Sequence, residues 1–428
     1  MTDIEINRSV QARPIQDVAN QLGIQTSELL PYGKLKAKVS LDVLERLHAA
    51  PLGRYILVTA INPTPLGEGK TTTSIGLAMG LSRLGHRTAV TLRQPSLGPV
   101  FGIKGGGTGG GRAQVLPMED INLHLTGDSH AVSASHNLLS AFVDNHLFHG
   151  NGLQVDPSRI IWPRTVGVSD RALRQVSLGE GAASRNGQFV ITEASEVMAV
   201  FALASSQADL RERLGRIIVG FTTGGKPVRA EEFGCAGSMA VLLREALLPN
   251  LVQTLEGTPA FVHAGPFGNI AHGNCSILSD AVALRCADYV VTEAGFGSDL
   301  GAEKFFNIKC RLSGFKPAVA VVVATLRALK LHGGGGAVKV GTPLPAGLIG
   351  PNQEALVKGF ANLEQHIANV KAHGVPVVVA VNAFIDDSIT ELEWVRERAK
   401  EVGAVDAAVS THWADGGKGA EELARAVI

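Results

Sequence analysis

Hydrophobic and polar positions along the chain fall into short apolar runs separated by longer amphipathic stretches. Apolar runs rich in β-branched residues are typical of strands buried on both faces, and they occur at residues 55–61, 88–92, 259–263, 288–292, 318–323, 375–381 and 405–409. Residues 353–372 and 388–402 carry apolar side chains at steps of three and four, which predicts helices. The alternation predicts an α/β fold, with a mostly parallel sheet flanked by crossover helices and a second, smaller α/β domain.

One strand-to-helix junction has the features of a phosphate-binding loop. Residues 54–81 read RYILVTAINPTPLGEGKTTTSIGLAMGL, an apolar strand followed by a loop and then by a packed helix from about residue 73. At a helix N-terminus, unpaired N–H groups and the helix dipole favour a polyphosphate. We therefore predict a P-loop NTPase-like nucleotide site in which Lys70 reaches the outer phosphates and Thr71 or Thr72 holds magnesium, with Thr71 as the first choice. The predicted binding residues are consecutive: Thr64, Pro65, Leu66, Gly67, Glu68, Gly69, Lys70, Thr71 and Thr72.

The loop is a variant, because Thr64 stands where the usual P-loop pattern has a glycine six residues before the lysine. Gly67 and Gly69 still allow the backbone to approach a phosphate closely. The strand end at residues 381–384 reads VNAF and lacks the NKxD signal of guanine-specific proteins, which favours ATP. The alternative is a glycine-rich turn that carries a solvated lysine and binds nothing.

Two further strand ends carry candidate site residues. Arg93 follows the run at residues 88–92, and ligands bind at the carboxyl ends of parallel strands, so its guanidinium is expected to hold an oxyanion in the same crevice. Glu293 follows the run at residues 288–292, where an acidic side chain could bind or orient magnesium. The glycine run at residues 105–111 is either a flexible linker or an anion-facing loop beside Lys104 and Arg112.

Residues 118–136, MEDINLHLTGDSHAVSASH, gather acidic residues and histidines in a short span. Zinc is one alternative, but His124, His130 and His136 stand six residues apart, which matches no compact zinc spacing on a helix. Polar hydrogen bonding around the site is favoured, with Asp128 as a candidate contact to a small anion or to a magnesium-bound water.

Composition narrows the classes of partner. The 428 residues carry 39 basic and 39 acidic side chains, so nothing indicates nucleic acid as an electrostatic partner. The four cysteines form no disulfide framework, and neither a signal peptide nor an apolar run of transmembrane length occurs, so we expect a cytoplasmic protein without a membrane partner. We expect a nucleotide-binding domain at residues 1–332, with an elaboration at about 168–256, and a second α/β domain at 333–428.

In order along the chain, the segments NPTPLGEGKTTT, LRQPSLGPVFGIKGG, PMEDINLHLTGD, GPFGNIAHG and EAGFGSDLGAEKFFNIKCR resemble the formate–tetrahydrofolate ligases. The resemblance implies that ATP, formate and tetrahydrofolate give 10-formyltetrahydrofolate, ADP and phosphate through formyl phosphate, with Mg²⁺ as cofactor. It implies catalytic roles for Lys70, Arg93 and Asp128. It also implies that Phe384 and Trp413 form aromatic walls around tetrahydrofolate, on the domain at 333–428. A homotetramer is implied as well, and a monovalent cation is left open.

Two features depart from the family pattern. Members ordinarily continue well beyond HWADGGKGAEELARAV, so this chain, which ends at Ile428, is expected to lack part of the folate-side domain. Arg112 stands where an aromatic residue is common. Two alternatives to the ligase stay open: a P-loop ATPase that works as a switch protein, and an inactive, truncated relative that binds nucleotide without turnover.

Overall fold

A 12-stranded sheet forms the centre of the computed structural model, which describes residues 1–98, 101, 107–179, 184–339 and 341–428. Along its main path the strand order is β1-β2-β13-β14-β4-β15-β3-β16-β17-β18, with β5 and β6 branching from β13. The strands are β1 (Leu29–Pro31), β2 (Ala37–Val39), β3 (Arg54–Ala60), β4 (Thr88–Leu92), β5 (Gly109–Gly110), β6 (Ala113–Leu116), β13 (Asn250–Thr254), β14 (Pro259–Val262), β15 (Tyr289–Glu293), β16 (Val319–Ala324), β17 (Val377–Asn382) and β18 (Asp406–Ser410).

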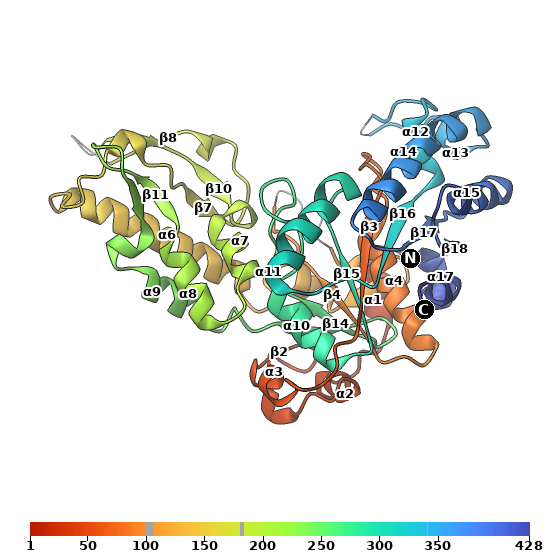
Figure 1. Ribbon diagram of the computed structural model, residues 1–428, viewed down its shortest axis with the longest axis horizontal. Helices are drawn as coiled ribbons and strands as arrows, with labels where there is room; N and C mark the ends of the chain where they lie inside the picture. The colour runs from red at the N-terminus through yellow and green to blue at the C-terminus, as the bar shows by residue number, and fades with distance from the viewer. Residues whose placement is uncertain (99–100, 102–106, 180–183, 340) are drawn as a thin grey trace.

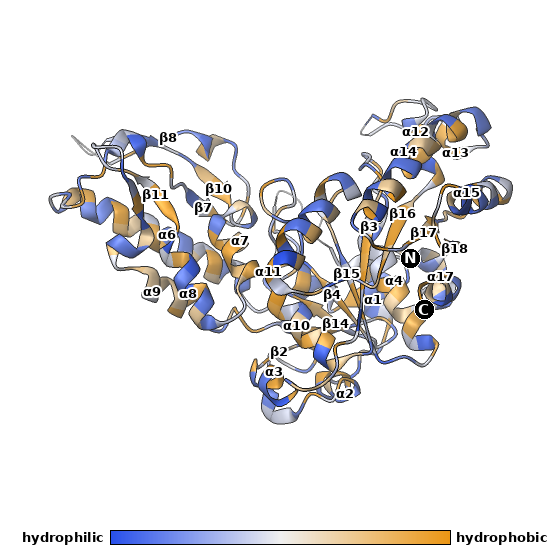
Figure 2. Cartoon of the chain, viewed as in Figure 1, coloured by the Kyte–Doolittle hydropathy of each residue, from blue (hydrophilic) through white to orange (hydrophobic). Residues whose placement is uncertain are grey.

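The strands from β14 to β18 along this path pair in parallel, and each lies within one or two residues of an apolar run in the sequence. The strands β1, β2 and β13 extend the sheet at the other end through antiparallel pairs. The predicted α/β fold with a mostly parallel sheet is therefore confirmed. Figure 2 shows the hydrophobic colouring concentrated on these strands.

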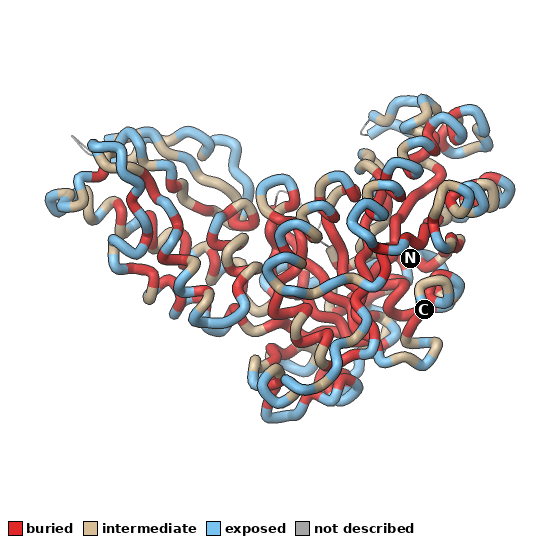
Figure 3. Tube along the Cα trace, viewed as in Figure 1, coloured by how far each residue is buried: buried red, intermediate tan, exposed pale blue. Residues whose placement is uncertain are grey.

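Helices cover both faces of the sheet. Successive side chains of a strand point to opposite faces, so an apolar strand presents apolar side chains to both helical layers. In β16, Ala320 and Val322 belong to one apolar cluster, whereas Val321 and Val323 belong to another. The first cluster takes in α2 (Ile15–Gln21), α10 (Ile277–Cys286), α12 (Leu326–His332), α14 (Gln353–Ala372) and α15 (Ile389–Glu401). The second takes in α4 (Lys70–Arg83) and α17 (Glu421–Val427). Figure 3 shows the strands buried between these layers.

A lobe built from the middle of the chain stands beside the sheet, at the left of Figure 1. Its helices are α6 (Asp128–Phe148), α7 (Glu196–Leu203), α8 (Gln207–Gly215) and α9 (Ala236–Leu242). Its strands form three two-stranded sheets: β7 (Arg164–Val166) with β10 (Phe189–Ile191), β8 (Val176–Leu178) with β9 (Arg185–Gly187), and β11 (Ile218–Phe221) with β12 (Pro227–Arg229). The lobe has an apolar cluster of its own around Phe201 and Met239. The predicted domain boundaries stay a prediction.

Short helices complete the chain: α1 (Asp3–Ser9), α3 (Asp42–Arg46), α5 (Met118–Asn122), α11 (Arg311–Ser313), α13 (Ala346–Ile349) and α16 (His412–Asp415). Two π-helical turns, Ser298–Ala302 and Phe305–Cys310, follow β15. Over the residues that the structure describes, no helix has both the length and the hydropathy to cross a bilayer.

Candidate functional site

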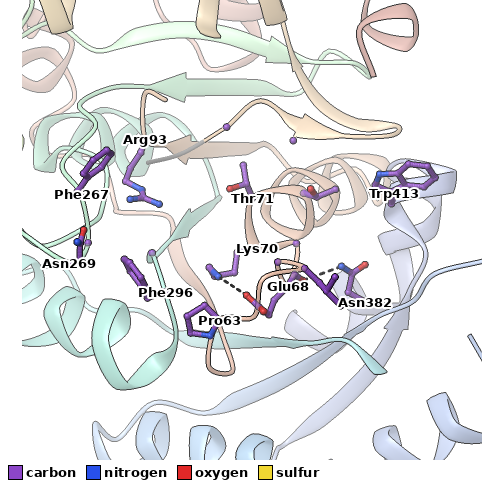
Figure 4. A pocket seen from close by; sticks show the side chains of 18 of the residues that line it. Pro63, Glu68, Lys70, Thr71, Arg93, Phe267, Asn269, Phe296, Asn382 and Trp413 are labelled. Atoms are coloured by element: carbon purple, nitrogen blue, oxygen red, sulfur yellow. Dashed lines mark hydrogen bonds and ion pairs between the residues drawn. The ribbon is translucent and has the colours of Figure 1, made fainter. Parts of the chain in front are cut away.

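A cavity of about 860 Å³ opens where the parallel strands end (Figure 4). Residues that follow β3, β4, β14, β15, β17 and β18 all contribute, as expected for a parallel sheet, whose ligands bind at the carboxyl ends of the strands. The lining residues are Pro63, Leu66, Gly67, Glu68, Gly69, Lys70, Thr71, Thr72, Arg93, Gly107, Gly109, Phe267, Gly268, Asn269, Gly295, Phe296, Asn382, Phe384 and Trp413.

The loop between β3 and α4 is held together by a buried carboxylate. Glu68 accepts a 2.6 Å hydrogen bond from the Thr64 N–H and lies 3.5 Å from the Lys70 Nζ. Gly69 is left-handed, with φ of 77°, so α4 begins at Lys70, three residues earlier than the apolar pattern predicts. Desolvation on burial lowers the pKa of Lys70, although the neighbouring Glu68 opposes that shift. Of the predicted loop residues, only Thr64 and Pro65 lie outside the cavity lining.

A second strand end also holds the loop. The Asn382 side-chain amide, at the end of β17, donates a 3.2 Å hydrogen bond to the Glu68 carbonyl. A Cβ on Gly69 would lie 2.5 Å from the Asn382 Nδ2, so this glycine is needed for the contact as well as for its φ. The loop is thus fixed from both sides, by its own glutamate and by β17.

Thr71 and Arg93 line the cavity, and both lie next to Glu293, a buried carboxylate that is not part of the cavity lining. The Thr71 hydroxyl donates a 2.6 Å hydrogen bond to Glu293 Oε2, and the Arg93 Nε lies 3.9 Å from Glu293 Oε1. Within the described ranges, neither Arg93 Nε nor Glu293 Oε1 has a hydrogen-bond partner. Burial lowers the pKa of Arg93, yet a guanidinium keeps its charge in proteins. Of the two side chains, Arg93 reaches the cavity wall, where its charge can face a ligand.

The donor set at this point suits magnesium. The Thr71 hydroxyl and the Glu293 carboxylate are oxygen ligands of the kind that Mg²⁺ binds while keeping several waters. Among the described residues, Oε1 of that carboxylate has no hydrogen-bond partner. In the part of the chain that the structure describes, no three His, Cys, Asp or Glu side chains are grouped to hold a metal ion. The site is thus suited to a cation that arrives with phosphate oxygens and not to an all-protein cage.

Phe384 and Trp413 both line the cavity, as the sequence-based hypothesis of two aromatic walls requires. Trp413 is 52% exposed, and its carbonyl accepts a 2.7 Å hydrogen bond from the Arg112 N–H. The Arg327 guanidinium lies 3.9 Å from the centroid of the Phe384 ring, a cation–π contact that restrains the ring. Both walls therefore have backbone or side-chain support.

Sequence reasoning missed two aromatic residues of the cavity. Phe267 and Phe296 lie near Arg93, on the side of the cavity away from Trp413 (Figure 4). Phe296 has φ of 62°, a left-handed conformation that costs a bulky residue about 1–3 kcal/mol. Their position in the sequence could have indicated this role. Each phenylalanine stands among glycines and other turn residues shortly after a predicted strand.

Asp128 does not line the cavity. Its carboxylate is 2% exposed, forms a 2.7 Å ion pair with Lys38 and accepts a 2.6 Å hydrogen bond from Asn250.

The three histidines at residues 124, 130 and 136 do not come together at one site. His124 and His130 contact each other at 2.8 Å, whereas His136 bonds Ser195 and is kept neutral because burial lowers its pKa to about 4. Lys104 and part of the glycine run lie outside the described residues.

The comparisons with known proteins agree on one family. A sequence model of the family described as formate–tetrahydrofolate ligase matches residues 1–428. Formate–tetrahydrofolate ligase 3 of Rubrobacter xylanophilus is 55% identical over 432 residues, covering 100% of this chain and 75% of that protein. The formate–tetrahydrofolate ligase of Saccharopolyspora erythraea is 56% identical over 431 residues, covering 100% and 76%. That of Desulforamulus reducens is 54% identical over 431 residues, with the same coverage.

Proposed function

Because the chain belongs to the formate–tetrahydrofolate ligase family, we propose that it joins formate to tetrahydrofolate with ATP, giving 10-formyltetrahydrofolate, ADP and phosphate. One observation carries the proposal: a single cavity contains the loop with Lys70, the Arg93 guanidinium and two pairs of aromatic side chains. A ligase with one small carboxylate substrate and two ring-bearing substrates needs this combination. A switch ATPase needs only the loop.

The loop and the start of α4 are proposed to hold the ATP phosphates. The N–H groups at the start of α4 and the Lys70 ammonium supply positive charge to the β- and γ-phosphates. Thr71 and Glu293 would hold magnesium, which neutralises phosphoryl charge when bound. The Thr71–Glu293 hydrogen bond supports this role because it holds the two oxygens together, and Glu293 is also close enough to Lys70 for its charge to act on the pKa of that lysine.

Arg93 is proposed to hold formate in line with the γ-phosphate. A guanidinium binds a carboxylate through two parallel hydrogen bonds, which fixes both position and orientation. A formate oxygen attacks the γ-phosphorus, the bond from phosphorus to the bridging oxygen breaks, and ADP leaves. The product, formyl phosphate, carries phosphate as a leaving group in place of oxide. The N10 amine of tetrahydrofolate then attacks the formyl carbon, phosphate leaves and N10 loses its proton.

The aromatic side chains are proposed to receive the two ring systems. Phe384 and Trp413 would enclose the pterin-bearing ligand, and stacking of this kind adds about 0.5–1.5 kcal/mol beyond burial. Phe267 and Phe296, on the other side of the cavity, offer faces for the adenine. The assignment is supported by the number of aromatic pairs, because the cavity contains two pairs and the reaction has two ring-bearing substrates.

Other properties are proposed from the family resemblance alone: a homotetramer, a cytoplasmic location and dependence on a monovalent cation. The role of Asp128 stays a prediction, and its ion pair with Lys38 favours a structural contribution. Sedimentation of the purified chain and product formation in potassium or tetramethylammonium salts would test the assembly and the cation.

The decisive experiment measures 10-formyltetrahydrofolate, converted by acid to the absorbing methenyl form, from ATP, magnesium, formate and tetrahydrofolate. Lys70→Ala and Arg93→Ala should abolish product, whereas the control variants Lys358→Ala and Arg87→Ala, with exposed side chains, should not. ADP release that needs neither formate nor folate would instead favour the switch ATPase. ATP binding by a folded chain without any turnover would favour the inactive relative.

A further inference from the structure

His412 is fully buried between β18 and α4, the helix that follows the predicted phosphate-binding loop. Its Nδ1 lies 2.8 Å from the Ser410 hydroxyl on β18, and its Nε2 lies 3.3 Å from the Thr73 hydroxyl on α4. Burial lowers the pKa of His412 to about 4, so the ring is neutral, with one nitrogen donating and the other accepting. The imidazole therefore links the sheet to α4 through two hydrogen bonds and carries no charge.

The helix α4 packs closely against His412 at this point. A Cβ on Gly76 of α4 would lie 2.5 Å from the His412 Cβ, so α4 approaches His412 as closely as a glycine allows. On the other side, a Cβ on Gly111 would lie 2.2 Å from the carbonyl oxygen of Trp413. Trp413 is thus held between two close glycine contacts, one through its neighbour His412 and one directly.

The other aromatic wall is linked to the nucleotide loop in a similar way. Phe384 stands two residues after Asn382, whose side chain donates to the Glu68 carbonyl of the loop. Each of the two aromatic residues therefore stands one or two positions after a polar residue in the sequence, and that polar residue contacts the loop or α4. Asn382 reaches the cavity itself, whereas His412 does not, so His412 can be changed without removing a ligand contact.

We propose that His412 is a positioning residue for the ring-binding side of the cavity, which holds Trp413 at a set place relative to α4 through Thr73 and Ser410. The identity of the ring as that of tetrahydrofolate rests on the proposed function. Loss of the link should weaken binding of tetrahydrofolate more than binding of ATP, because the loop between β3 and α4 keeps its own contacts through Glu68 and Asn382.

The kinetic test compares His412→Leu with His412→Gln. His412→Leu should raise the KM for tetrahydrofolate about three- to tenfold, the factor that loss of one or two hydrogen bonds produces, and should change the KM for ATP less than about twofold. His412→Gln should recover part of the loss, because its amide can still reach the Thr73 hydroxyl. Equal increases in both KM values, or no recovery with glutamine, would overturn the proposal.

A second measurement does not depend on the reaction. In a Trp162→Phe, Trp394→Phe background, Trp413 is the only tryptophan left, and acrylamide quenching reports its exposure without substrates. His412→Leu should change the quenching constant, and Thr73→Val, which removes the partner and keeps the histidine, should change it in the same direction. Unchanged quenching in both variants would overturn the proposal even if the enzyme is active. Changed quenching in a chain that makes no product would support it while the proposed function fails.

Discussion

The Thr71 hydroxyl and the Glu293 carboxylate are joined by a 2.6 Å hydrogen bond across 222 residues of sequence. Thr71 lies in the first turn of α4, and Glu293 is the last residue of β15. The contact exists because β15 pairs in parallel with β3, the strand that leads into the loop before α4. A hydroxyl and an acid that the sequence offers as separate magnesium candidates are therefore neighbours.

Glu293→Gln should lower kcat on the order of 100-fold, because it keeps the hydrogen bond from Thr71 but removes the charge that would hold magnesium. The magnesium concentration needed for half-maximal activity should rise as well. Steady-state rates across a magnesium titration check both effects. Glu303→Gln, at an exposed position, is the matched control and should behave as wild type. A Glu293→Gln variant with normal magnesium dependence would contradict the assignment.

Arg93→Lys should raise the KM for formate about tenfold or more, since an ammonium cannot make the two parallel hydrogen bonds of a guanidinium. The KM for ATP should change less. Initial rates at varied formate measure the effect. The same exchange at Arg87, whose side chain is 52% exposed, should leave the KM for formate unchanged. If formate and ATP were affected alike, Arg93 would instead serve the phosphates.

Phe384→Leu should raise the KM for tetrahydrofolate about three- to tenfold, because leucine retains apolar area but loses the stacking surface. The Arg327 guanidinium also loses its ring contact in this variant. Kinetics at varied tetrahydrofolate check the prediction. Phe148→Leu, on a side chain that is 82% exposed, controls for the exchange itself. A change in the KM for ATP alone would place the nucleotide, and not the folate, against Phe384.

The stability of the chain should depend on pH through Glu193. Burial raises the pKa of this carboxyl from 4.5 to about 7, so the folded state binds the proton more tightly than the unfolded state. The contribution of the protonated Glu193 to the free energy of unfolding is present in full below pH 4.5 and is lost as pH rises through about 7. Its size is about 3 kcal/mol.

Glu193→Gln mimics the protonated form at every pH. The variant should therefore match wild type near pH 5 and become more stable than wild type as pH approaches 8. Urea unfolding of both proteins at intervals between these pH values measures the difference. A difference that stays constant with pH would show that Glu193 is ionised in the folded protein throughout.

Asp128→Asn should destabilise the chain by about 3–5 kcal/mol, because it leaves the Lys38 ammonium buried without its counter-charge. Lys38→Met combined with Asp128→Leu should recover part of that loss, since an apolar pair replaces the ion pair. Urea unfolding measures the stabilities, and product formation per folded chain is measured alongside. Full stability with lost activity in Asp128→Asn would favour the catalytic role implied by the family resemblance.

Several elements were predictable because their signals are local. The helix predicted at residues 353–372 is α14 (Gln353–Ala372), since its apolar face repeats with helical spacing along one uninterrupted segment. The strand predicted at residues 88–92 has the predicted bounds because it is a short apolar run rich in β-branched residues, also a local signal. The start of α4 was placed three residues late, because Lys70, Thr71 and Thr72 are polar although they already belong to the helix.

By itself, the sequence determined the α/β class, the seven parallel strands, the loop between β3 and α4 and the side chains available at each of those strand ends. These features depend on residues that are close along the chain. Only the tertiary structure decided that Asp128 pairs with Lys38, that Phe267 and Phe296 line the cavity, and that His412 contacts Thr73. Such contacts follow from the strand order, which joins segments 90 to 339 residues apart. A local pattern carries no information on that order, because burial makes every central strand similarly apolar.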